Sequence, residues 1–153
     1  MSERYFEDFA AGQIFVSARR LRVSKDDILS FARQFDPQPF HLDEQAARDS
    51  IFKGLAASGW HTAALTMRLV TESEFRSATG TTGLGVDLLR WPVATRPGDE
   101  LHIESEVLEV RPSRSRPDFG LMKMRVRTVN QTGQVVQELV SNELVPCRPA
   151  NAA

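Results

Sequence analysis

Residues 57–70 read ASGWHTAALTMRLV and form the most hydrophobic stretch of the chain, with Arg68 as the one charged residue. Ser58 suits the N-cap position of a helix, which makes Gly59 the first helical residue. A helix that is apolar nearly all round has to be buried on most sides. The stretch therefore predicts a buried helix around which the rest of the fold is arranged.

The chain before this helix contains one expected strand and two expected helices. Residues 13–22 are expected to form the strand. Ser24, with Asp27 three residues later, predicts a helix start, and apolar side chains at helical spacing continue from Ile28. Pro37 ends this helix, because the residue before a proline disfavours helical geometry. A second short helix is expected over residues 43–48.

The chain after the buried helix has the pattern of antiparallel strands. Glycines and threonines over residues 80–85 indicate a turn, and residues 120–129 alternate apolar with basic side chains, as in a strand with one buried face. Residues 130–133, NQTG, predict a hairpin turn. Strands are expected over residues 86–91, 101–110, 120–129 and 134–145. The pattern predicts an α+β domain in which a curved antiparallel sheet wraps the helix.

Length and composition predict one cytoplasmic domain over residues 1–153. Hydrophobic residues make up 41% and charged residues 25%, and the net charge is −1, which favours neither a nucleic-acid nor a membrane partner. The N-terminus lacks the apolar region of a signal peptide, and no apolar run reaches the ~20 residues of a membrane span. The single cysteine, Cys147, fits a reducing compartment and has no obvious base beside it.

A candidate site lies in residues 36–41, DPQPFH, between two expected helices. Two prolines stiffen this segment, as catalytic geometry requires. Asp36 and a neutral His41 aimed at one water would suffice to add water reversibly across an activated double bond. On residue types alone, the alternative is ordinary turn chemistry with a surface histidine.

The same segment resembles the MaoC-like dehydratases, the (R)-specific enoyl-CoA hydratase group. The family pattern is roughly Asp-x-Asn-Pro-x-His-x-Asp, then an alanine, a phenylalanine and a glycine that opens a buried helix. Gln38 departs from this pattern, which usually has asparagine there. The matching residues are Asp36, Pro39, His41, Asp43, Ala46, Phe52 and Gly59, and Trp91-Pro92 and residues 96–99 also resemble the family.

The resemblance implies a hotdog fold, usually a homodimer, that acts on acyl thioesters of coenzyme A or acyl carrier protein without a further cofactor. Asp36 and His41 would hold the attacking water, and His41 is the natural proton carrier because histidine ordinarily titrates near pH 6.5. The thioester oxygen would point at the free N–H of Gly59, where the helix dipole meets developing negative charge. Gly59 would let the ligand approach the backbone closely, or it could simply begin the helix.

Five further residues are expected to bind the substrate. Gln38 can donate a hydrogen bond within the motif, while Ser58 and Trp60 lie at the start of the helix. Arg96 and Arg114 are candidates for the ligand's phosphates, although Arg114 lies in a basic, serine-rich turn that could simply be solvated.

The other two histidines are expected to be structural. His61 is expected to be packed or hydrogen-bonded, and His102 is expected to be exposed among glutamates. No tight ligand motif supports a metal site.

Three functions remain open on the sequence. An enoyl thioester hydratase or dehydratase is favoured by Asp36, His41 and Gly59 together. A hotdog thioesterase would generally place its acidic residue, glutamine or histidine differently on the fold. A non-catalytic acyl-CoA-binding protein would be expected to lose Asp36 or His41, and this chain keeps both.

Overall fold

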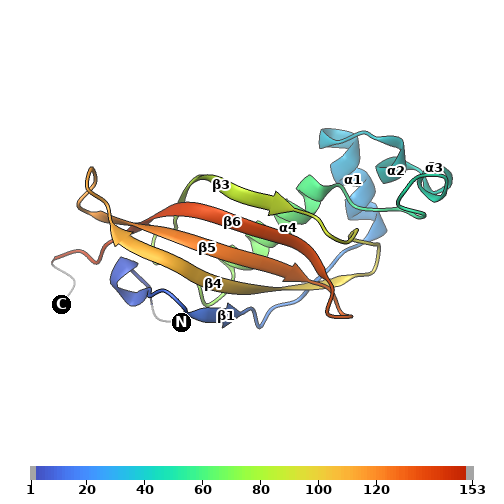
Figure 1. The fold of residues 1–153 in the computed structure, drawn as a ribbon. Coiled ribbons are helices and arrows are strands. Elements are labelled where there is room, and N and C mark those ends of the chain that lie inside the picture. The colour runs from blue at the N-terminus through green and yellow to red at the C-terminus, as the bar shows by residue number, and fades with distance from the viewer. Residues whose placement is uncertain (1–2, 151–153) are drawn as a thin grey trace.

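A six-stranded antiparallel sheet dominates the computed structural model, which describes residues 3–150. The strand order is β1-β4-β5-β6-β3, and the short β2 also pairs with β4 (Figure 1). The strands are β1 (Ile14–Val16), β2 (Leu21–Arg22), β3 (Thr82–Arg90), β4 (Glu100–Pro112), β5 (Phe119–Val129) and β6 (Val135–Pro146). The predicted α+β class with an antiparallel sheet is confirmed.

The helix α4 (Gly59–Thr71) lies against one face of this sheet and contacts β4 and β6. Its predicted start is confirmed, because the Ser58 hydroxyl accepts a hydrogen bond from the Trp60 N–H at 3.3 Å. The prediction that α4 is buried on most sides is wrong for the single chain, since Trp60 is 60% and Met67 48% exposed. The sheet covers only one side of the helix.

Three further helices gather at one end of the sheet (Figure 1). They are α1 (Lys25–Phe35), α2 (Pro39–Leu42) and α3 (Glu44–Arg48), and a short 3₁₀ turn, η1 (Phe6–Asp8), precedes the sheet. Ser24 caps α1 by accepting from the Asp27 N–H at 3.0 Å, and Asp43 caps α3 by accepting from the Ala46 N–H at 2.7 Å. Both predicted helices are thus confirmed. The α2 turn was not predicted, although Pro39 suits the first position of a helix.

Two strand predictions need correction. The single strand predicted over residues 13–22 is split into β1 and β2, because Ser17 between them bonds to β4 through its hydroxyl as well as its backbone. The predicted turn at residues 80–85 overlaps β3, which already begins at Thr82. The register of β3 against β6 is irregular between Gly83 and Gly85, which allows the glycine-rich segment to pair as a bulged strand.

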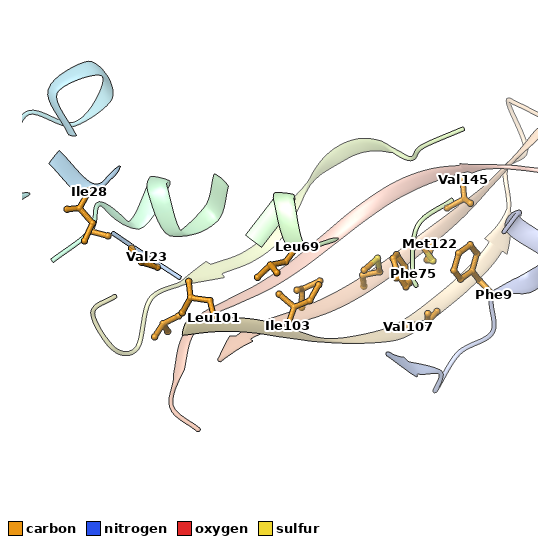
Figure 2. Packing of buried hydrophobic residues seen from close by; sticks show 14 of the residues in the cluster. Phe9, Val23, Ile28, Leu69, Phe75, Leu101, Ile103, Val107, Met122 and Val145 are labelled. Carbon is orange, nitrogen blue, oxygen red and sulfur yellow. The ribbon is translucent and has the colours of Figure 1, made fainter. Parts of the chain in front are cut away.

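The core lies between α4 and the sheet and extends to both ends of the molecule (Figure 2). In β5, Met122, Met124 and Val126 point inward, which confirms the predicted alternation. Ile28 of α1 packs at the end of the core where the short helices gather, and Phe9 and Phe75 contact each other near the opposite end. Within residues 3–150, no helix is both long and apolar enough to span a membrane.

Candidate active site

The two predicted catalytic side chains meet at the end of the molecule that carries the short helices. Asp36 follows α1 directly, and His41 lies in the α2 turn that begins at Pro39. Their facing atoms, Asp36 Oδ2 and His41 Nε2, are 3.4 Å apart. The His41 ring is only 4% exposed and lies against the rings of Phe40 and Phe52. The stiffened segment therefore brings both groups together, as the sequence predicted.

A hydrogen bond fixes the proton position on His41. Its Nδ1 lies 2.7 Å from the carbonyl oxygen of Ala56, and a carbonyl can only accept, so Nδ1 carries the proton. In the neutral ring, Nε2 then presents a lone pair toward the Asp36 carboxylate. Two acceptors that face each other at 3.4 Å leave no room for an atom between them, so a donor that bonds to both has to lie beside them. A water molecule or a substrate hydroxyl would satisfy both.

Hydrogen bonds from two neighbours hold the Asp36 carboxylate. Gln38 Nε2 donates to Oδ1 at 2.7 Å, and the buried Ser58 hydroxyl donates to Oδ2 at 2.6 Å. Burial alone raises the pKa of Asp36, but these two hydrogen bonds and the nearby imidazole of His41 outweigh it. The pKa therefore lies below its usual value, and the group is an acceptor at neutral pH. Gln38 and Ser58, predicted to bind substrate, are positioning residues for Asp36 in this structure.

Gly59 lies at the N-terminus of α4, and no hydrogen bond within residues 3–150 occupies its N–H. The close approach that requires glycine comes from Trp91, because a Cβ on Gly59 would lie 2.6 Å from the indole ring. The structure thus gives one reason for the glycine, and close approach by a ligand stays a prediction. Sequence reasoning missed this contact, although Trp91 was part of the family resemblance.

A cavity of about 220 Å³ adjoins His41 and Gly59. Trp60, predicted to contact the substrate, does not line this cavity; its exposed ring lies edge-on against Trp91, with 5.4 Å between the centroids. Thr62 and Thr95 had no sequence signal as lining residues, because nothing local to either one reveals the other. The lining residues are His41, Phe52, Ala57, Gly59, Thr62, Trp91, Val93, Ala94, Thr95 and Val136.

Arg96 is a brace for the loop before α4, which corrects its prediction as a phosphate ligand. Its guanidinium donates to the carbonyl oxygens of Phe52, Gly54 and Leu55. Lys53 in this loop has a φ of 57°, a left-handed conformation that needs such support. The donors of Arg96 are therefore directed at the main chain and not at a ligand.

Arg114 is also not brought to the site. It is exposed in the turn between β4 and β5, which lies at the end of the sheet away from α1, α2 and α3 (Figure 1). Within one chain this turn and the Asp36–His41 pair therefore lie at opposite ends of the sheet (Figure 1). The alternative of a solvated basic turn fits its position.

The remaining histidines have structural environments. His61 is buried and stacks on Phe31 at 4.8 Å between ring centroids, which confirms the packed position predicted for it. His102, predicted to be exposed, is instead mostly covered and bonded through Nδ1 to Arg20 at 2.9 Å. No group of three or more His, Cys, Asp or Glu side chains within residues 3–150 could hold a metal ion.

The MaoC-like domain profile matches residues 8–131, which include Asp36, His41 and the residues that hold these two side chains in place. The chain belongs to the MaoC-like domain family. The uncharacterized protein YdeM of Bacillus subtilis (strain 168) is 36% identical over 125 residues, which cover 82% of this chain and 86% of YdeM. The family predicted from residues 36–59 is therefore confirmed.

Solved structures of this family share the architecture of the MaoC-like domain described above. A MaoC-like dehydratase from Rhodospirillum rubrum is 53% identical with a TM-score of 0.91, over 95% of this chain and 99% of that one. The unliganded R-hydratase PhaJ1 from Pseudomonas aeruginosa is 27% identical with a TM-score of 0.75, over 94% and 86%. The antiparallel sheet around α4 is the hotdog fold, as the resemblance implied.

Proposed function

We propose that this MaoC-like domain is a hydro-lyase that adds water reversibly to a trans-2-enoyl thioester and gives a 3-hydroxyacyl thioester. The observation that carries the proposal is the 3.4 Å approach of Asp36 Oδ2 to the unprotonated Nε2 of His41, beside the free N–H of Gly59. Two acceptors orient a water, and the helix N-terminus accepts negative charge. Hydration of an enoyl thioester needs both functions in one place.

The reaction follows from these atoms. The water donates one O–H to Asp36 and the other to His41, so its oxygen lone pair faces C3 of the enoyl group. As the C3–O bond forms, His41 Nε2 takes a proton, and the electrons of the C2–C3 double bond move to the thioester oxygen. The Gly59 N–H and the α4 dipole stabilise this enolate oxygen. His41 then returns its proton to C2, so one water is added and no charge is left over.

Two relatives support this reaction class by their names. One is the MaoC-like dehydratase at 53% identity and the other is the R-hydratase PhaJ1 at 27% identity. The proposed steps use side chains and a backbone amide of this chain, and the acyl carrier, coenzyme A or acyl carrier protein, enters as part of the substrate. We propose no additional cofactor.

The decisive experiment incubates the protein with crotonyl-CoA and, separately, with butyryl-CoA. We expect the conjugated enoyl absorbance to fall without release of free thiol, because water adds to C3 and the thioester survives. Free thiol from either compound would instead identify a thioesterase. Binding of the acyl-CoA with no fall in enoyl absorbance and no release of free thiol would identify a non-catalytic acyl-CoA-binding protein.

Substitutions at the dyad test the mechanism. Asp36→Asn and His41→Ala should each lower kcat by about 100-fold or more, the usual contribution of a positioned acid–base group. Asp26→Asn, on the exposed first turn of α1, and His102→Gln on β4 are matched controls that should keep wild-type rates. Full activity in either dyad variant would overturn the assigned roles.

A further inference from the structure

The space between the start of α4 and the loop that follows β3 bounds the acyl group that this site can take. The cavity next to His41 and Gly59 has a volume of about 220 Å³. At ~30 Å³ for each water-sized position, this is room for roughly seven non-hydrogen atoms. A crotonyl thioester brings four carbons, one oxygen and one sulfur, whereas an octenoyl thioester brings ten such atoms.

A chain of buried hydrogen bonds occupies the space beyond this cavity. Trp91 Nε1 donates to Gln137 Oε1 at 2.8 Å, and Gln137 Nε2 donates to the Thr66 hydroxyl at 3.0 Å. Thr66 Oγ1 lies 2.6 Å from Thr128 Oγ1. The residues Gln137, Thr66 and Thr128 have no exposed surface. The chain therefore links the wall of the cavity, β6, α4 and β5 in one row.

This row crosses the path that a longer acyl group would take along α4. Thr62 lies one turn into the helix and lines the cavity, while Thr66 lies one turn further and belongs to the row. An acyl chain that passed Thr66 would separate bonded polar atoms and leave them unpaired beside hydrocarbon. Unpaired buried donors and acceptors cost free energy, so the row should block a longer acyl chain at this point, as the closed end of the cavity, and not yield to it.

Thr95 gives the closed end a polar surface. The Thr62 hydroxyl donates to Thr95 Oγ1 at 2.9 Å, and both side chains are buried and line the cavity. The end of the acyl group would thus meet hydroxyl groups where a long-chain site would present aliphatic side chains. Neither threonine carries a charge, so this part of the lining suits a neutral group.

We propose that the site is specific for short acyl groups, and that Gln137, held between Trp91 and Thr66, sets the limit of length. This inference rests on the proposed hydratase function. Gln137 would not touch the reacting atoms, so its role is in specificity alone.

The test measures kcat/KM of the wild-type protein for trans-2-enoyl-CoA substrates of four, six, eight and ten carbons. We expect the four-carbon substrate to be preferred, with kcat/KM for the eight-carbon substrate lower by about 10-fold or more. Equal or higher kcat/KM for eight and ten carbons would overturn the length limit while the hydratase function stood. No hydration of any substrate would overturn the hydratase function itself.

Gln137→Ala probes the closed end directly. Removal of the amide should raise the ratio of eight-carbon to four-carbon kcat/KM by about 10-fold, because it opens the row. Gln45→Ala, the same change on the exposed face of α3, should leave that ratio unchanged. A folded Gln137→Ala protein with a wild-type ratio would contradict the role of Gln137, and the wild-type series decides the length limit if the variant does not fold.

Discussion

The Ser58 side chain supports both the Asp36 carboxylate and the start of α4. The hydroxyl of Ser58 reaches Asp36 from 22 positions along the chain, and it also caps α4 through the Trp60 N–H. The carboxylate and the helix end are therefore fixed by the same side chain. In the proposed mechanism, this side chain would hold the acceptor for water and the donor for the enolate oxygen at a fixed separation.

Ser58→Ala should raise the pKa of the Asp36 carboxyl. Burial raises the pKa of Asp36, and the Ser58 hydrogen bond is the strongest influence that lowers it, so its loss lets the pKa rise. Because the proposed mechanism also needs His41 Nε2 unprotonated, the pH profile of kcat/KM does not report Asp36 alone. The measurement is therefore an NMR titration of the Asp36 carboxyl carbon across the acid range.

Ser115→Ala, in the exposed turn between β4 and β5, is the matched control and should leave the titration of Asp36 unmoved. A wild-type titration of Asp36 in Ser58→Ala would mean that Ser58 acts only as a helix cap.

For individual residues, the sequence predicted the Asp36–His41 pair but not the groups that hold it in place. Asp36, His41 and Gly59 stand in a recognisable motif, so their types and spacing were sufficient. The donors to Asp36 were assigned to the substrate, because a sequence does not say which acceptor a buried hydroxyl or amide will meet. Trp91 lies against Gly59 through a contact that only the folded chain creates.

Among the elements, the packing of α1 against α4 contains a histidine whose pKa is shifted by its surroundings. His61 of α4 stacks on Phe31 of α1 and is 6% exposed. Burial lowers the pKa of His61, and the charge of Asp27 on α1 opposes this only in part. Protonation of His61 therefore destabilises the interface between these helices.

His61→Phe should make the free energy of unfolding fall less steeply as the pH is lowered below neutrality. In the unfolded chain the histidine takes up a proton near pH 6.5, whereas the folded chain resists it, so the stabilisation present above pH 6.5 is lost as the pH falls toward the lowered pKa. Phenylalanine keeps the ring and does not titrate. Urea denaturation at pH 7.5 and pH 5.5 should show a smaller loss of unfolding free energy in the variant.

Asp27→Asn is the complementary change. It removes the charge that favours protonated His61, so it should lower the pKa further and extend the loss of stability to lower pH. An acid-side loss in His61→Phe equal to that of the wild type would assign the effect to other groups.

Element boundaries were predicted where a side chain marks them locally. Ser24 and Asp43 cap their helices as their types suggest, and Pro37 follows the end of α1. The break between β1 and β2 could not be predicted, because it depends on a hydrogen bond that the Ile103 N–H donates to the Ser17 hydroxyl from 86 positions away. The pairing of the glycine-rich start of β3 likewise depends on its partner strand.

For the whole molecule, the resemblance and the strand pattern together predicted the hotdog architecture, while the exposed side of α4 was not predicted. That side continues into the free edge of β3. At one end, Trp60 packs on Trp91, which directly follows β3, and at the other end Met67 lines a cavity with Gly80 and Thr81, which precede it. Residues 57–70 thus contain more apolar side chains than the single chain buries.

We propose that a second copy of the chain covers this surface, which we define by Trp60, Met67 and Val86. The edge strand β3 is nine residues long, and long edges with exposed apolar side chains are templates for pairing. The opposite edge strand, β1, has only three residues. An antiparallel copy placed along β3 would extend the sheet and cover the open side of α4.

Met67→Lys combined with Val86→Lys should therefore dissociate a dimer. Each lysine would have to be buried without a partner, which should weaken association by about 100-fold or more. Light scattering after gel filtration should give the mass of two chains for the wild type and of one chain for the variant. Ile14→Lys is the matched control: Ile14 is 68% exposed on β1, and Val86 is 56% exposed on β3. A dimer that survives the double substitution but not Ile14→Lys would place the interface at β1.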